Sequence, residues 1–131
     1  MTHLSKVLLA VALTLPAVTI GAETGVKPDK SATKTYKISD IYKNKDPLNK
    51  QQVTVKGKVV KVSSGIMDKN WFHIQDGSGK ENSKNNDLTV TTTQAAPSVG
   101  KTVTVSGTVY KDKDFGAGYF YNVIVEQATY R

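Results

Sequence analysis

The sequence predicts a small all-β domain whose strands close into a barrel or pack as a sandwich. Five segments between residues 53 and 127 are predicted strands, and four of them have the period of two that is typical of a strand with one apolar face. Two of these segments carry a glycine in mid-strand, which is typical of long strands that bend sharply, as in a barrel wall. The chain has 131 residues, which leaves room for one domain, and closure removes the exposed edges of short antiparallel strands.

Residues 1–22 precede this domain and predict a secretory signal peptide. Met1 to Lys6 form a positive start, residues 7–18 are almost wholly apolar, and small residues follow at 19–22. A membrane anchor is the alternative, but an apolar run of about 12 residues interrupted by Pro16 is shorter than the roughly 20 that span a bilayer. We therefore expect cleavage, export to the periplasm or outside the cell, and no integral membrane segment in the mature protein.

The mature chain is predicted to begin with a flexible segment, residues 23–35, followed by the folded domain, residues 36–131. Ser39 is a candidate N-cap with Asp40 in the first turn, and Ile41, Tyr42 and Leu48 would give one short helix interrupted by Pro47. Such a helix is too short to form without packing on another element.

The first and fourth predicted strands repeat one pattern. Residues 53–61 read VTVKGKVVK and residues 103–111 read VTVSGTVYK, so Gly57 and Gly107 occupy equivalent positions. As far as Val59 and Val109, the valines share one parity with the glycine, while lysine, threonine and serine share the other. The alternative is a chance match between two Val-Thr strands.

The second predicted strand, residues 70–76, places Phe72 and Ile74 on one face and Trp71, His73 and Gln75 on the other. It ends at a turn, residues 76–79 (DGSG), and a polar loop follows at 80–86. The third strand, residues 88–93, sets Leu88 and Val90 against threonines. The fifth, residues 119–127, contains VIV at 123–125 without alternation, which indicates a strand covered on both faces.

The run from Val53 to Val62, followed by residues 71–79 (WFHIQDGSG), resembles the first two strands of OB-folds of the anticodon-binding type. Together with the signal peptide and the block 112–119 (DKDFGAGY), the chain from about Tyr36 resembles small exported bacterial OB-fold proteins (BOF-like), which are described as nucleic-acid- or nucleotide-binding. This resemblance implies a five-stranded Greek-key OB-fold barrel with a short N-terminal helix.

The resemblance also implies a binding face on the second and third strands, flanked by loops at residues 63–69 and 111–118. Trp71 matches the position where the family often presents a stacking aromatic, with His73 and Gln75 beside it. The sequence departs from the family in one respect. The family usually has a helix between the third and fourth strands, but here that connection has only residues 94–100, which include Pro97. We expect that helix to be absent and the segment around residues 39–46 to cap the barrel instead.

The residues themselves favour binding over catalysis. An exposed aromatic with hydrogen-bonding side chains and a basic rim suits a single-stranded nucleic acid or a sugar. The alternative for Trp71 is a structural role, in which the indole fills an irregular part of the core or packs under the N-terminal helix. Phe115 and Tyr119 could clamp a ligand or belong to the core. The candidate rim, which could equally be an ordinary solvated face, consists of Lys56, Lys58, Lys61 and Lys69.

No catalytic residue, metal site or cofactor is expected. The chain has no cysteine, which excludes disulfides, thiolate metal sites and a cysteine nucleophile. His73 is the one histidine outside the predicted signal peptide. Residues 112–116 (DKDFG) resemble the start of a calcium loop, but Val123 stands where the bidentate glutamate should be. The glycines of residues 116–118 are better explained by a turn than by phosphate binding.

The sequence therefore predicts an exported, monomeric OB-fold binding protein without enzymatic activity, whose ligand is a nucleic acid, a nucleotide or another anionic or oligomeric molecule. Two alternatives remain: an accessory module that binds a protein of the cell envelope, in stress response or electron transfer, and an oligosaccharide binder. The formal charge of +7 favours anionic partners. Only +3 of it lies from residue 51 onward, however, so the charge is weaker support for nucleic acid than the total suggests.

Overall fold

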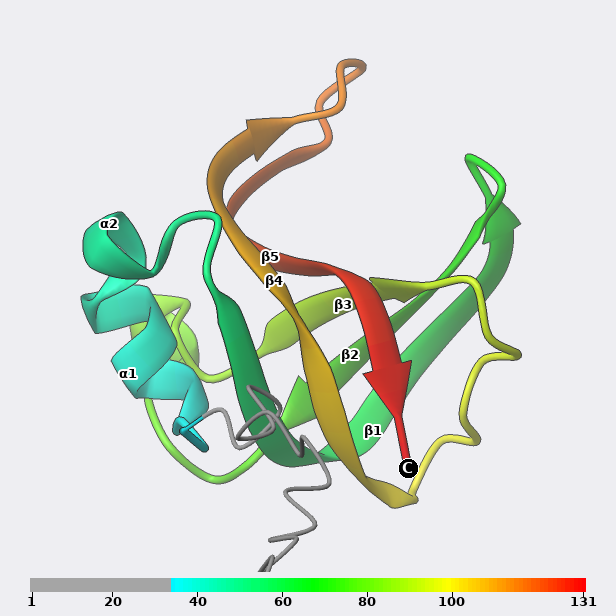
Figure 1. Cartoon of the computed structure of the whole chain (residues 1–131), viewed down its shortest axis with the longest axis horizontal. Coiled ribbons are helices and arrows are strands. Elements are labelled where there is room, and N and C mark those ends of the chain that lie inside the picture. Colours follow the sequence, from blue (N-terminus) through cyan, green and yellow to red (C-terminus); the bar gives the residue numbers. More distant parts are fainter. Residues whose placement is uncertain (1–33) are drawn as a thin grey trace, which may run out of the picture.

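A computed structural model describes residues 34–131 and consists of five strands and three short helical segments (Figure 1). The predicted signal peptide, residues 1–22, and nearly all of the segment predicted to be flexible, residues 23–35, lie outside the described residues. The elements in chain order are α1 (Ile38–Lys43), α2 (Lys45–Leu48), β1 (Gln52–Ile66), β2 (Lys69–Gln75), the 3₁₀ segment η1 (Glu81–Ser83), β3 (Leu88–Thr92), β4 (Thr102–Asp114) and β5 (Phe120–Tyr130).

The five strands form a closed barrel in the order β1-β2-β3-β5-β4. All neighbouring strands are antiparallel except β3 and β5, which pair in parallel. This order and the closure confirm the predicted five-stranded OB-fold barrel with a short N-terminal helix. Residues 94–100 contain no helix, as expected from Pro97 and the shortness of that segment.

The two repeated segments pair with each other along β1 and β4. Val55 faces Val105 at the centre, Val53 faces Gly107, and Gly57 faces Val103, so each glycine lies opposite a valine of the other copy. Pairing with β4 continues to Lys58, where pairing with β2 begins. A Cβ atom at Gly57 would lie 3.0 Å from the carbonyl oxygen of Gln75, so the glycine allows the next strand to approach closely.

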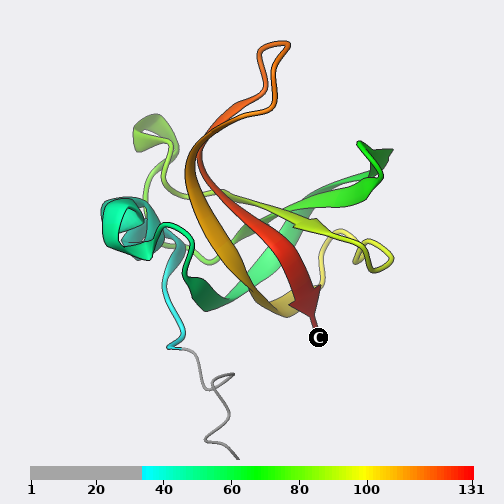
Figure 2. The same cartoon turned by 45° about the horizontal axis from the view of Figure 1, so that its top comes forward.

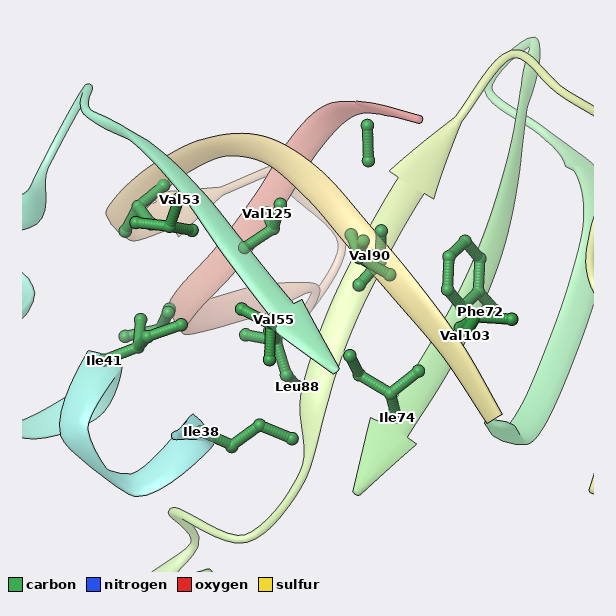
Figure 3. Packing of buried hydrophobic residues seen from close by; sticks show 14 of the residues in the cluster. Ile38, Ile41, Val53, Val55, Phe72, Ile74, Leu88, Val90, Val103 and Val125 are labelled. Atoms are coloured by element: carbon green, nitrogen blue, oxygen red, sulfur yellow. The ribbon is translucent and has the colours of Figure 1, made fainter. Parts of the chain in front are cut away.

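The barrel interior is filled by the predicted apolar parity of each strand (Figure 3). Val53, Val55, Phe72 and Val90 are all fully buried there. Val123 and Val125 of β5 belong to the same core, whereas the fully buried Ile124 lies outside it, which confirms that this segment is covered on both faces. Other members of the core are Val59, Ile74, Leu88, Val103, Val105, Val109 and Ala128.

The N-terminal helices cap one end of the barrel, as expected, because Ile38, Ile41 and Leu48 join the core. The prediction of Ser39 as N-cap was wrong: α1 begins at Ile38, and its N-cap position is Lys37. The orphan amides of the first turn are satisfied from the turn after β2 instead. The backbone N–H of Ile38 donates to Oδ2 of Asp76 (2.9 Å), and that of Ser39 donates to Oγ of Ser78 (3.0 Å).

Two hairpins project from the barrel on the same side (Figures 1 and 2). The loop predicted at 63–69 is mostly strand, because β1 runs to Ile66 and β2 begins at Lys69. Of the loop predicted at 111–118, the first half is strand, because β4 runs to Asp114. Ile66 pairs with Lys69, and the two residues between them, Met67 and Asp68, have positive φ (51° and 58°). Such a two-residue turn matches the right-handed twist of the flanking strands, so the β1–β2 hairpin stays paired to its tip.

Candidate functional site

The outer face of the β1–β2 pair brings together most of the predicted site residues. The resemblance implied a face on β2 and β3 instead, but every residue of β3 is buried. The register places Lys58 opposite Gln75, Lys61 opposite His73, and Ser63 opposite Trp71. A bulge at Val60 interrupts the ladder between Val59 and Lys61, and the extra residue keeps both lysines on the outer face although their spacing is odd. We call the row formed by Lys56, Lys58, Lys61, Ser63, Trp71, His73 and Gln75 the outer strip.

Trp71 does not offer an exposed ring, so the expectation of a stacking platform was wrong. Its side chain is 6% exposed, and Nε1 donates to the carbonyl oxygen of Ile66 (2.8 Å). Phe115 packs edge-on against the indole, with ring centroids 5.3 Å apart, and the centroid of Tyr121 lies 5.9 Å away. The indole is buried neither in the barrel core nor under α1, because the β4–β5 hairpin covers it from outside.

A pocket of about 200 Å³ opens between the two hairpins. The aromatic surface that it presents comes mainly from Tyr119, which is 55% exposed, and from Tyr121, with Trp71 beneath. Tyr119 thus lies at the predicted place, whereas Phe115 packs on Trp71 and does not line the pocket. The other lining residues are Lys61, Ser63, Ile66, Met67 and His73.

Asp87, which the sequence did not single out, positions two of the predicted side chains. Its Oδ1 lies 2.6 Å from Nδ1 of His73, and its Oδ2 accepts a hydrogen bond from Nε2 of Gln75 (3.0 Å). Burial raises the pKa of this carboxyl, but hydrogen bonds from His73 and Gln75 and the nearby charge of Lys61 outweigh that effect, so its pKa is below the ordinary value. Asp87 therefore fixes the orientation of His73 within the strip.

Lys56 and Lys58 continue the strip into a groove of about 620 Å³. Both lysines are exposed, and neither they nor Lys61 form an ion pair within residues 34–131. The one acidic residue that lines the groove is Asp76, whose carboxylate is engaged by Ile38 and Ser78. The remaining lining residues are Gly57, Val60, Gln75, Gly77 and Thr102.

Lys69 departs from the predicted rim. Its Nζ lies 3.2 Å from Oε1 of Glu126, and Nζ of Lys113 lies 3.3 Å from Oε2 of the same carboxylate. Glu126 is only 4% exposed, so its buried charge requires these partners. Lys69 thus joins the start of β2 to the β4–β5 hairpin and, unlike Lys56, Lys58 and Lys61, is already paired with a carboxylate.

Residues 34–131 contain no group of three or more side chains suited to hold a metal ion. Within the same part of the chain, no helix is long and apolar enough to cross a membrane.

No protein-family model and no curated protein matches the chain. Among solved structures, the chain is similar to an aspartyl-tRNA synthetase from Leishmania major Friedlin, with a TM-score of 0.53 and 10% sequence identity. The match covers 76% of this chain and 21% of that one, so this chain spans about a fifth of the neighbour's length. At such low identity the likeness bears on the fold alone, and it agrees with the OB-fold barrel.

Proposed function

We propose that this protein is an exported OB-fold module that binds single-stranded nucleic acid along the outer strip. The observation that carries the proposal is the β1–β2 register, which sets Lys58 beside Gln75 and Lys61 beside His73, next to the pocket with Tyr119. Cations, hydrogen-bonding groups and aromatic rings in one row are what a nucleotide chain requires. The likeness to an aspartyl-tRNA synthetase is compatible with a nucleic-acid ligand.

Each part of the strip has a distinct role in this proposal. Lys56, Lys58 and Lys61 neutralise phosphates, and a base stacks on Tyr119 or Tyr121 at the pocket. Stacking contributes roughly 1–3 kcal/mol per base and tolerates any base, because every base has a π-face. Three phosphate contacts to a single strand predict that the logarithm of the affinity falls with the logarithm of the salt concentration with a slope of about −2.

The same proposal holds that the protein binds its ligand without catalysis and that it is exported. Residues 1–22 support export, since they have the positive start, apolar centre and small terminal residues of a signal peptide. N-terminal sequencing of the protein from the cell envelope should then begin near Glu23. A protein that retains Met1 and stays in the cytoplasm would contradict this part of the proposal.

Fluorescence titration tests the binding itself. Trp71 is the one tryptophan in the chain and lines the pocket, so quenching by oligothymidylate at low salt reports on this site alone. Tyr119→Ala should weaken binding about tenfold, because it removes a stacking contact of roughly 1–3 kcal/mol. Phe120→Ala is the matched control, since Phe120 is equally exposed but does not line the pocket. If no oligonucleotide quenches Trp71 at low salt, the proposal is wrong.

A protein partner is the second candidate function, favoured by apolar side chains at the tips of both hairpins. Ile66 and Met67 on one hairpin and Tyr119 and Phe120 on the other are about half exposed. A partner of the cell envelope that docks there should be lost from an Ile66→Ser, Met67→Ser variant and retained by a Lys58→Gln, Lys61→Gln variant. The reverse pattern would favour nucleic acid, and quenching by glycans without salt dependence would indicate an oligosaccharide ligand.

A further inference from the structure

A second groove, of about 510 Å³, is lined mainly by residues of α1 and of the loop that precedes β3. Three lysines line it against one acidic residue, Asp40. Lys45 is paired with Asp112 (3.0 Å), whereas Lys43 and Lys84 are exposed and form no ion pair within the described part of the chain. The other lining residues are Ser39, Tyr42, Ser83, Asn85 and Asn122.

The polar groups of this groove suit a ligand rich in acceptor oxygens. Oδ1 of Asn85 already accepts a hydrogen bond from the backbone N–H of Lys80 (2.8 Å), so its amide N–H groups are the part left to bind a ligand. Asn122 lies on the outer face of β5 and is exposed. The groove therefore offers two ammonium groups together with amide and hydroxyl donors, and charge-assisted hydrogen bonds from such groups to phosphate oxygens are strong.

The second groove and the outer strip meet at Asp87. Tyr42 lines the groove, and its hydroxyl donates to the carbonyl oxygen of Asp87 (2.6 Å). Burial, together with the charge of Asp87, raises the pKa of Tyr42 to about 12, so the hydroxyl keeps its proton and remains a donor at neutral pH. The carboxylate of the same Asp87 holds His73 and Gln75 of the strip. One residue therefore separates the two surfaces.

We infer that this groove is a second phosphate subsite, occupied by the continuation of a strand that lies on the outer strip. The inference rests on the proposed function and extends the contact of the bound single strand from the outer strip, past Asp87, to this groove. OB-fold domains bind roughly 4–16 nucleotides of single strand, which is consistent with two surfaces on one barrel.

The test compares a four-nucleotide with a twelve-nucleotide oligothymidylate on a Lys43→Gln, Lys84→Gln variant. Affinity for the longer strand at low salt should fall about tenfold, and its salt slope should become shallower by about 1.4, the value for two lost phosphate contacts. Affinity for the shorter strand should stay unchanged. The matched control, Lys50→Gln with Arg131→Gln, removes the same charge from exposed residues that line neither the strip nor the groove.

The outcomes separate the two proposals. If the double variant binds the longer strand with unchanged affinity and salt slope, the second subsite is wrong and the outer strip stands. An equal loss for both strands, or the same loss in the control, would show a long-range charge effect and would also overturn the subsite. If the wild-type protein binds neither strand, the proposed function fails and the subsite fails with it. Loss of fold is not expected, because neither Lys43 nor Lys84 has a side-chain partner within residues 34–131.

Discussion

Gly107→Ala is expected to destabilise the barrel, although alanine is a small residue and the backbone there has no positive φ. A Cβ atom at this position would lie 2.6 Å from Cγ1 of Val125, and 3.0 Å from both Cβ of Ala128 and the carbonyl oxygen of Glu126. Val125 is fully buried in the core, so its branched side chain has no free space into which it could rotate. Strand β5 must therefore move away from β4.

The size of the effect follows from two opposing terms. Overpacking a core position typically costs about 1–3 kcal/mol. Replacing glycine by alanine also reduces the entropy of the unfolded chain, which stabilises the fold by roughly 0.4–1 kcal/mol. The net decrease in the free energy of unfolding should be about 1–2 kcal/mol, which lowers the urea midpoint by about 1 M if the m-value is about 1.5 kcal/mol/M.

Urea unfolding followed by Trp71 fluorescence measures this change, and a double-mutant cycle with Val125→Ala assigns it. Because the shorter side chain at position 125 removes the nearest clash, Gly107→Ala should cost little in that background, with an interaction energy of about 1–2 kcal/mol. An unchanged or raised urea midpoint for Gly107→Ala, or an interaction energy of zero, would refute the assignment of this glycine to close strand approach.

Two further predictions concern charged groups. Burial raises the pKa of Asp76, but hydrogen bonds from Ser78 and from the backbone of Ile38 outweigh it, and the pKa of Asp87 is also lowered. A carboxyl whose pKa is depressed stabilises the fold above its ordinary pKa of 3.8, and this contribution is lost as the pH falls. The urea midpoint should therefore fall below about pH 4, and it should fall less steeply in Asp76→Asn. If the urea midpoint has the same pH dependence in both proteins, Asp76 does not have this role. Glu126→Gln should lower the free energy of unfolding, measured by urea titration, by about 1 kcal/mol at low salt and by less at high salt, because its lysine partners are more than a third exposed. A loss of stability that is independent of salt would argue against an ionic contribution.

The barrel could be predicted from the sequence because the alternation of apolar and polar residues along each strand shows which of its faces is buried. Val53, Val55 and Val59 alternate with polar residues, and the structure buries all three. The unbroken run at 123–125 was equally informative, since Ile124 is buried on the outer face. Local periodicity is sufficient to predict which residues are buried where the burial results from the barrel itself.

The details of the site could not be predicted, because they depend on contacts between distant segments. Trp71 and His73 have the same parity, yet the indole is buried by rings that follow more than forty residues later, at Phe115 and Tyr121. Nothing in the sequence marks the bulge at Val60 that brings Lys58 and Lys61 to one face. Asp87 lies at the end of a polar loop, where its role in holding His73 has no sequence signature.

The pairing of the two repeated segments has a consequence for how the chain folds. The β1–β2 hairpin closes through a two-residue turn, and hairpins of this kind form in about 1–10 μs. The Val55–Val105 contact instead requires a loop of about 50 residues, and the entropic cost of closing it exceeds that of a two-residue loop by about 3 kcal/mol. We therefore expect the two hairpins to form early and the β1–β4 seam to limit the rate, which places folding in the millisecond-to-second range of small β-barrels.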